Sequence, residues 1–178
     1  LSPMAVIAKL IKEKRPNAKT VFIGPCTAKK AEAKQEHVKG YVDCVLTFEE
    51  LLALIKAKDI TLKELAETEL DDATLFGRIF ARSGGVTEAI IQSLKEQESN
   101  FDIKPITCDG IENIRPILAK ANKGILPNNF IEGMACKGGC TNGAASIFHD
   151  TKGIQRVNDY SREALTDDPT EGIRGYDM

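Results

Sequence analysis

Residues 20–26 read TVFIGPC, and this stretch decides the fold. A short, continuous apolar run that stops at Gly-Pro is typical of a strand buried in a parallel sheet. Residues 42–47, 103–107 and 129–134 repeat the pattern, with apolar residues at helical spacing between them. Strands that alternate with helices predict the α/β class, with a mainly parallel four-stranded sheet flanked by helices on both faces.

Helix start signals support this order of elements. Ser2 and Pro3 open the first helix, because Ser can cap it and Pro is preorganised for its first turn. Thr47 and Glu50 have the spacing of a capping box, at the start of the helix predicted after the second strand. These signals therefore support a helix at the start of the chain and a helix after the second predicted strand.

The composition is that of a globular protein. The chain has 178 residues, of which 42% are apolar and 28% charged, and its net charge is −2. This balance argues against a surface built for nucleic acid or an anionic membrane, and no apolar run approaches the roughly 18 residues of a membrane span. We expect residues 1–150 to form one α/β domain and residues 151–178 a C-terminal helix and a linker. Because the chain begins at Leu1, we interpret it as a piece of a longer or processed protein.

The cysteines indicate a site. Five cysteines in a chain of this size argue against a disulfide framework and favour a cytoplasmic protein, in which clustered cysteines more often bind metal or do redox chemistry. Cys26 follows the first predicted strand, and Cys136 and Cys140 follow the fourth. Because ligands of open α/β sheets bind outside the carboxyl ends of the strands, the three thiols are predicted to converge on one crevice.

The residues around these thiols suit an iron–sulfur cluster better than zinc. Gly138 and Gly139 let the backbone wrap around a bulky anionic object and leave amides free to face it. Lys29, Lys30 and Lys137 add positive charge, which favours thiolates. Zinc knuckles usually pair cysteines at both ends of a short loop. A cubane requires four ligands and three are convincing, so spacing alone leaves a cluster and buried structural cysteines as equal alternatives.

The other candidates have simpler interpretations. Cys44, inside the second predicted strand, is expected to be a small core residue. Cys108 closes the third strand, so it is either a core residue or a neighbour of the crevice. His37 and His149 lie in polar segments and are predicted on the surface. The acidic residues of 67–72 are interpreted as a solvated loop rather than a metal site.

Residues 24–32 read GPCTAKKAE, and residues 134–140 read MACKGGC. The first motif resembles the second signature of the iron-only (FeFe) hydrogenases, Met-Pro-Cys-x-x-Lys-Lys-x-Glu. The second resembles their third signature, Met-Ala-Cys-Pro-Gly-Gly-Cys. The resemblance spans about residues 2–146, with both motifs in the right order and at about the right distance. It implies that the chain is one lobe of the two-lobed FeFe-hydrogenase catalytic domain.

The resemblance implies roles for the matching residues. Cys26 and Cys136 would ligate the 4Fe-4S half of the H-cluster, and Cys140 would bridge that cubane to the two-iron centre. Lys29 would donate a hydrogen bond to a cyanide ligand of that centre. The implied reaction is the reversible reduction of protons to hydrogen, with Lys29 and Cys140 as catalytic residues.

The resemblance also implies a surrounding shell and an electron source. Met134 and Phe80 would help enclose the two-iron centre, and Gly138 and Gly139 belong to the cluster-binding motif. Electrons would come from a ferredoxin-like donor or an attached iron–sulfur domain.

Several residues depart from the family pattern. Gly24 stands where catalytic members have Met, and Lys137 stands where they have Pro. Residues 144–146 read Ala-Ala-Ser in place of Gly-Gly-Gln. Loss of the Met side chain is expected to open space near the two-iron centre, and Lys137 changes the local charge. These changes resemble the sensory or regulatory branch of the family, whose members are often fused to signalling domains.

Three hypotheses remain open. In the first, the chain is a fragment of an FeFe-hydrogenase. We expect it to hold no cofactor and to turn over no hydrogen by itself, because the family's first signature supplies the fourth cubane ligand and a proton-relay cysteine. In the second, the chain is a 4Fe-4S-binding sensory or regulatory module without hydrogen turnover, coupled to a downstream signalling domain. In the third, it is an α/β domain with unused thiols.

Overall fold

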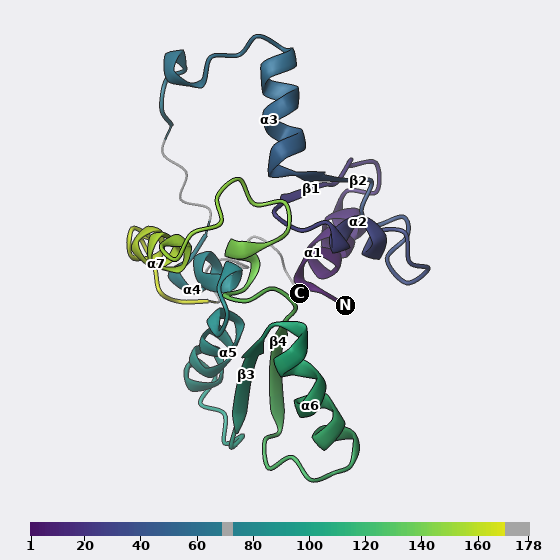
Figure 1. The fold of residues 1–178 in the computed structure, drawn as a ribbon, viewed down its shortest axis with the longest axis vertical. Coiled ribbons are helices and arrows are strands. Elements are labelled where there is room, and N and C mark those ends of the chain that lie inside the picture. Colours follow the sequence, from purple (N-terminus) through teal and green to yellow (C-terminus); the bar gives the residue numbers. More distant parts are fainter. Residues whose placement is uncertain (69–72, 170–178) are drawn as a thin grey trace. The chain divides into compact units, whose positions relative to one another are not determined.

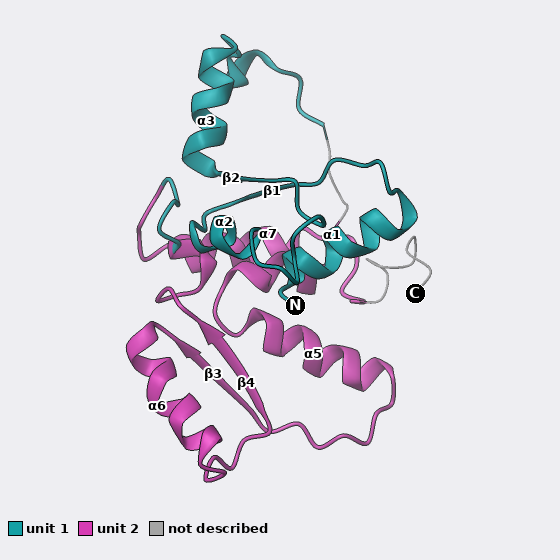
Figure 2. Ribbon diagram, turned by 90° about the vertical axis from the view of Figure 1, so that its right-hand side faces the viewer, with its two compact units in different colours: residues 1–68, 143–147 teal, residues 69–142, 148–178 magenta. Residues whose placement is uncertain are grey.

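The computed structural model describes residues 1–68 and 73–169, which form two compact units (Figure 2). Unit 1 comprises Leu1–Thr68 and Gly143–Ile147, and unit 2 comprises Glu69–Asn142 and Phe148–Met178. Most of the predicted acidic loop and the end of the predicted linker lie outside the described residues. Within the described ranges, no helix is long and apolar enough to cross a membrane.

Unit 1 is built around two short parallel strands (Figure 1). Val21 lies opposite Cys44 and Gly24 opposite Thr47 in their register. In chain order, its elements are α1 (Pro3–Lys14), β1 (Val21–Gly24), α2 (Ala28–Glu32), β2 (Cys44–Thr47), α3 (Phe48–Ala57) and the 3-10 helix η1 (Leu62–Glu64).

The core of unit 1 forms where α1 packs against the segment that leads into β2. Apolar residues of α1 recur at helical spacing, so one face of the helix is buried and the other stays in solvent. The buried cluster consists of Met4, Ala5, Ala8, Val38, Val42 and Val45.

Side-chain caps explain where the helices of unit 1 begin. The Oγ of Ser2 accepts a hydrogen bond from the Ala5 amide at the start of α1. Thr47 and Glu50 form the predicted capping box at the start of α3, with each side chain accepting from the other residue's backbone N–H. Both start signals are therefore confirmed.

Unit 2 repeats the strand–helix–strand plan. Its strands are parallel, with Pro105 opposite Phe130 and Asp109 opposite Met134. In chain order, the elements are α4 (Leu75–Arg78), η2 (Ile79–Ala81), α5 (Gly85–Glu96), β3 (Pro105–Asp109), α6 (Ile111–Asn122), β4 (Phe130–Met134), η3 (Cys140–Asn142) and α7 (Gly153–Arg162).

A buried arginine attaches α7 to the rest of unit 2. The Arg78 guanidinium lies over the Tyr160 ring, 4.3 Å from its centroid, and its Nη1 donates to the Tyr160 carbonyl oxygen at 3.0 Å. Its Nε donates to the Ala73 carbonyl oxygen at 3.1 Å. A buried guanidinium is stable only when acceptors meet its N–H donors, and α7 supplies one of these acceptors. Arg78 therefore fixes α7 to the rest of unit 2.

The α/β class and the parallel pairing are confirmed, but the single four-stranded sheet is not. Within residues 1–68 and 73–169, the strands form two two-stranded sheets, β1–β2 and β3–β4. An apolar run identifies a strand but does not specify its neighbours. The strands are also less buried than a central strand, since Val21 is 51% and Ile23 43% exposed.

Candidate functional site

Cys26 lies in the turn that joins β1 to α2. Its thiol is free and half-buried. A later segment of the chain holds this turn in place. Residues 143–147 belong to unit 1, and the Ala145 amide donates a hydrogen bond to the Pro25 carbonyl oxygen at 3.1 Å. The structure therefore places Cys26 at the carboxyl end of β1, as predicted.

The two lysines of α2 have different environments. The Nζ of Lys30 donates to the Val45 carbonyl oxygen at 3.1 Å and to both carboxylate oxygens of Glu50, at 2.9 and 2.7 Å. Lys30 therefore joins α2 to β2 and α3. The Nζ of Lys29 instead donates to Glu32 Oε2 at 2.6 Å. Lys29 is therefore the lysine of α2 that still has N–H groups to donate to a bound ligand.

Cys136 and Cys140 lie on one tight turn after β4. Both side chains are half-buried, and neither forms a disulfide. Gly138 and Gly139 have φ angles of +81° and +86°, a region that side chains strongly disfavour. A Cβ on Gly139 would lie 2.5 Å from the Ser83 amide nitrogen. The two glycines are therefore required for the turn to form and to lie close to the segment before α5.

Three further contacts hold this turn in place. The Gly138 amide donates to Asp109 Oδ2 at 2.9 Å, which ties the turn to the end of β3. Gly139 forms an isolated antiparallel bridge with Arg82. The Thr141 hydroxyl donates to the Gly138 carbonyl oxygen at 3.0 Å. The backbone between the two thiols is thus fixed by unit 2 alone.

Glu132 is a buried carboxylate beneath the same segment, and the sequence analysis missed it. It is 5% exposed and accepts hydrogen bonds from the Gly84 amide at 2.8 Å and from the amide and hydroxyl of Thr87 at 2.8 and 2.5 Å. It therefore serves as the cap of α5, which begins at a glycine and has no cap of its own. An acidic residue within an apolar strand was the signal that could have revealed it.

Cys108 is buried, in agreement with one of its two expected environments, whereas Cys44 is not in the core. Cys108 is buried, and its thiol donates to the Glu132 carbonyl oxygen at 3.3 Å. Burial, with the nearby charges of Asp109 and Glu132, raises the pKa of the Cys108 thiol and keeps it protonated. Cys44, expected in the core, is exposed, because it begins β2 at an open end of a two-stranded sheet. That expectation was wrong.

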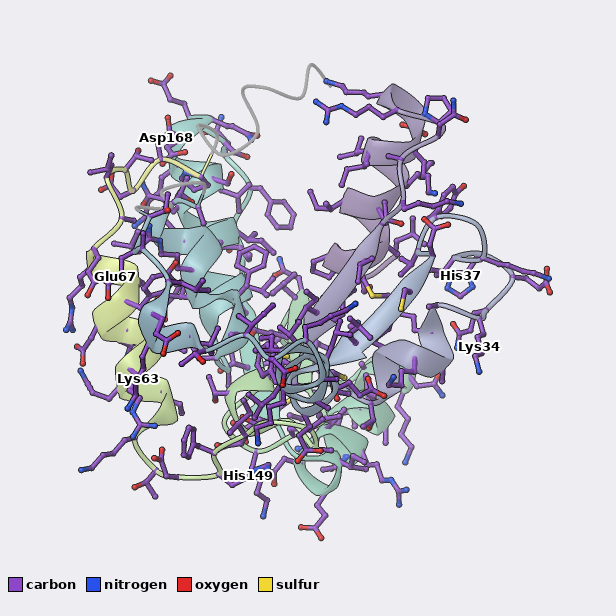
Figure 3. All side chains as sticks on the ribbon, turned by 90° about the horizontal axis from the view of Figure 1, so that it is seen from above. Lys34, His37, Lys63, Glu67, His149 and Asp168 are labelled. Carbon is purple, nitrogen blue, oxygen red and sulfur yellow. The ribbon has the colours of Figure 1, made fainter. Side chains whose placement is uncertain are left out.

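The two histidines are exposed, as expected (Figure 3). Met134 and Phe80, the predicted enclosing residues, are both half-buried in unit 2, at the end of β4 and in η2. The Gly139 turn approaches the carbonyl of Ala81, the residue after Phe80. Met134, Phe80 and the glycine turn therefore all belong to unit 2, while Cys26 and Lys29 belong to unit 1. The convergence of all three thiols remains a prediction.

The Phe22 ring lies beside Gly24. A Cβ on Gly24 would lie 2.8 Å from Cε1 of that ring. The expected opening of space near the two-iron centre remains a prediction.

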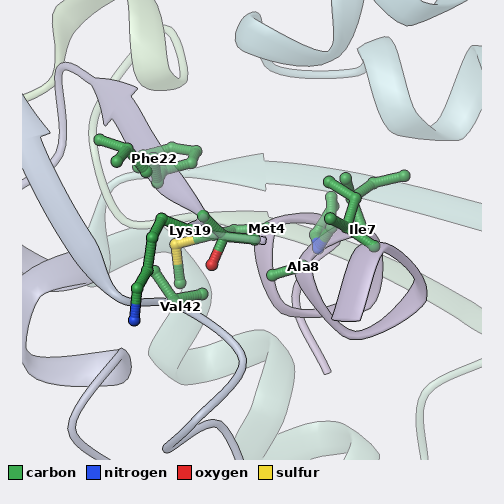
Figure 4. A pocket seen from close by; sticks show the side chains of 10 residues that line it. Met4, Ile7, Ala8, Lys19, Phe22 and Val42 are labelled. Carbon is green, nitrogen blue, oxygen red and sulfur yellow. The ribbon is translucent and has the colours of Figure 1, made fainter. Parts of the chain in front are cut away.

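An apolar groove of unit 1 takes no part in this arrangement (Figure 4). It has a volume of about 510 Å³ and lies between α1 and β1, where Met4, Ile7 and Phe22 line it. None of the predicted cluster residues lines it. Among residues 1–68 and 73–169, no group of three His, Cys, Asp or Glu side chains stands at metal-binding distances.

Comparison with known proteins identifies the family. The family described as "Iron only hydrogenase large subunit, C-terminal domain" matches residues 1–144. The chain belongs to this family. That match covers both cysteine motifs and the whole of β1 to β4.

Two curated relatives differ in their names. The cytosolic Fe-S cluster assembly factor narfl of Xenopus tropicalis is 27% identical over 96% of this chain and 46% of its own length. Iron hydrogenase 1 of Clostridium pasteurianum is 30% identical over 80% of this chain and 31% of its own length. The chain spans less than half the length of both relatives.

Solved structures show the same fold. A variant of the FeFe-hydrogenase HydA1 from Chlamydomonas reinhardtii superposes with a TM-score of 0.61 at 20% identity, over 97% of this chain and 62% of that chain. A structure that reports stepwise H-cluster assembly in a HydA protein has a TM-score of 0.62, also at 20% identity, over 94% of this chain and 59% of that chain. The fold of this chain is therefore that of the FeFe-hydrogenase domain.

Proposed function

We propose that this chain is the part of an FeFe-hydrogenase that carries two of its cysteine signatures, and that the whole protein reversibly reduces protons to hydrogen. The observation that carries the proposal is the turn from Cys136 to Cys140. Two half-buried cysteine side chains flank two glycines with positive φ, and contacts within unit 2 fix the backbone between them. This donor set fits a sulfur-ligated iron cluster, because thiolates are the usual ligands and a glycine turn admits a bulky anion.

The residues of the chain would divide the work. Cys26, Cys136 and Cys140 would hold the 4Fe-4S and two-iron groups, which supply electrons and a metal surface for proton reduction when bound. Lys29 would donate a hydrogen bond to an anionic ligand. Met134, as a half-buried apolar side chain two residues before Cys136, would limit the access of water.

A second function is favoured by specific observations. We propose as the alternative a 4Fe-4S-binding sensory or regulatory module without hydrogen turnover, coupled to a signalling domain. Gly24, where catalytic members carry Met, lies beside the Phe22 ring. Lys137, which replaces Pro, is exposed on the cysteine turn. The relative named as an Fe-S cluster assembly factor also supports a role other than hydrogen turnover.

Anaerobic reconstitution of the full-length protein tests both functions. Iron, sulfide and infrared bands of cyanide and carbonyl ligands, together with hydrogen evolution from a reduced ferredoxin-like donor, would support the first. A cubane without those bands would support the second. We expect Cys136→Ser to lose the iron and Cys44→Ser, an exposed cysteine outside the motifs, to keep it. Equal iron contents in the two variants would contradict both functions.

A further inference from the structure

Lys29 and Glu32 form a short ion pair on α2. The Lys29 Nζ lies 2.6 Å from Glu32 Oε2, and the two side chains are 23% and 21% exposed. Residues three apart on a helix share one face, so the pair forms without strain. A pair this short and this shielded is held more firmly than an exposed surface pair.

Glu32 is charged when it holds Lys29. Burial opposes ionisation of Glu32, but the hydrogen bond and the positive charge of Lys29, together with the nearby Ser2 side chain, lower its pKa overall. The carboxylate is therefore charged at neutral pH, and its contact with Lys29 is the short hydrogen bond to Oε2.

Lys29 retains donor capacity that its neighbour lacks. An ammonium carries three N–H donors. Those of Lys30 meet the Val45 carbonyl and both oxygens of Glu50. Among the described residues, Glu32 is the one hydrogen-bond acceptor of Lys29, so two of its N–H groups remain. Lys29 comes three residues after Cys26 in the chain.

We propose that Glu32 is a positioning residue for Lys29: it holds one N–H of the ammonium, and so sets the direction in which the other two donate to an anionic ligand beside Cys26. The identity of that ligand, a cyanide of the two-iron centre, rests on the proposed function. Glu32 touches no ligand and acts through Lys29 alone.

Site-resolved lysine labelling of the chain, without a cluster, tests the ion pair. Limiting acetylation with an N-hydroxysuccinimide ester, followed by peptide mass spectrometry, gives a rate for each lysine. We expect Glu32→Gln to raise the Lys29 rate by about fivefold to tenfold, because a charged hydrogen bond is lost. The rates at Lys30 and Lys12 should stay unchanged, whereas unfolding would raise them all.

Matched variants separate position from charge. Glu50→Gln removes the same charge beside the neighbouring lysine and should raise the Lys30 rate but leave the Lys29 rate unchanged. Glu32→Asp keeps the charge on a shorter side chain, so an increase at Lys29 supports positioning, and a wild-type rate overturns it. If Glu32→Gln does not fold, the Lys29 rate of Glu32→Asp decides between these two outcomes.

Infrared spectra of the loaded full-length protein connect the pair to the ligand. We expect Glu32→Gln to shift the cyanide bands and to leave the iron content unchanged. Faster labelling with unshifted bands would overturn the positioning role. A wild-type protein that loads iron but shows no cyanide bands would overturn the proposed hydrogenase function, and the labelling result would still decide whether Glu32 holds Lys29.

Discussion

At the scale of single residues, Gly139 marks a close approach between two backbone segments of unit 2. Its φ is +86°, and a Cβ there would lie 2.5 Å from the Ser83 nitrogen and 2.8 Å from the Ala81 oxygen. Backbone atoms cannot move aside as the end of a flexible side chain can. The substitution Gly139→Ala therefore combines an unfavourable φ with a collision.

We expect Gly139→Ala to lower the free energy of unfolding of unit 2 by more than about 2 kcal/mol. Gly124→Ala is the matched control, because Gly124 has a φ of +67° and nothing within 4 Å of its Cβ position. Gly124→Ala should lower the free energy of unfolding by about 1 kcal/mol, because it introduces the unfavourable φ without a collision. Urea unfolding of both variants measures the difference, and equal losses would contradict the close approach.

Glu132 is the residue on which the start of α5 depends. Three donors meet its two oxygens, and replacement by Gln would turn an NH₂ group toward N–H groups. We expect Glu132→Gln to lower the free energy of unfolding by about 1–3 kcal/mol, the range for a buried group left without its partner. Glu112→Gln, at an exposed position in the first turn of α6, should change it by less than about 0.5 kcal/mol. Chemical denaturation of the two variants would show whether buried Glu132 matters more than exposed Glu112.

At the scale of elements, Asp43 joins α1 to the start of β1. Its Oδ2 accepts from Lys12 Nζ and from the Thr20 amide, both at 2.7 Å. The hydrogen bonds from Lys12 and from the Thr20 backbone lower the pKa of Asp43 from 3.8 to about 2. The carboxylate therefore stabilises unit 1 when it is charged.

The sign of this effect fixes the expected pH dependence. Because the folded pKa lies below the unfolded value, the stabilisation is present above pH 3.8 and is lost as the pH falls toward about 2. We expect Asp43→Asn to be less stable than the wild type at pH 7, with a difference that shrinks across this window. Urea unfolding at several pH values tests the idea, and a difference that does not change with pH would exclude an ionic role for Asp43.

The elements also show what the sequence could and could not predict. The four strands and the Thr47–Glu50 capping box are local patterns, and both were found where the sequence places them. The pairing of strands is not local, so one four-stranded sheet was expected where there are two pairs. Burial of Cys44 was misjudged for the same reason, because exposure depends on what covers a strand. The role of Glu132 arises from contacts with residues 45 and 48 positions away, which no motif encodes.

At the scale of the whole molecule, the question is whether the two cysteine motifs form one site. Gly143–Ile147 belongs to unit 1, and the Ala145 amide bonds to Pro25, the residue before Cys26. Ala145 follows Cys140 by five residues in the chain. That Cys26 meets the thiols of unit 2 remains a prediction, which chemical cross-linking tests.

We expect a short thiol-to-thiol cross-linker to join Cys26 to Cys136 or Cys140 in the folded chain, and peptide mapping by mass spectrometry would identify the linked pair. Cys44 is the matched control. It is more exposed than Cys26 and belongs to the same unit, but it lies opposite Val21 at the far end of the β1–β2 sheet. Links from Cys26 should therefore exceed those from Cys44 and should disappear in urea. If Cys44 captures the thiols of unit 2 as fast as Cys26 does, the three cysteines do not share a crevice and cannot together hold one cluster.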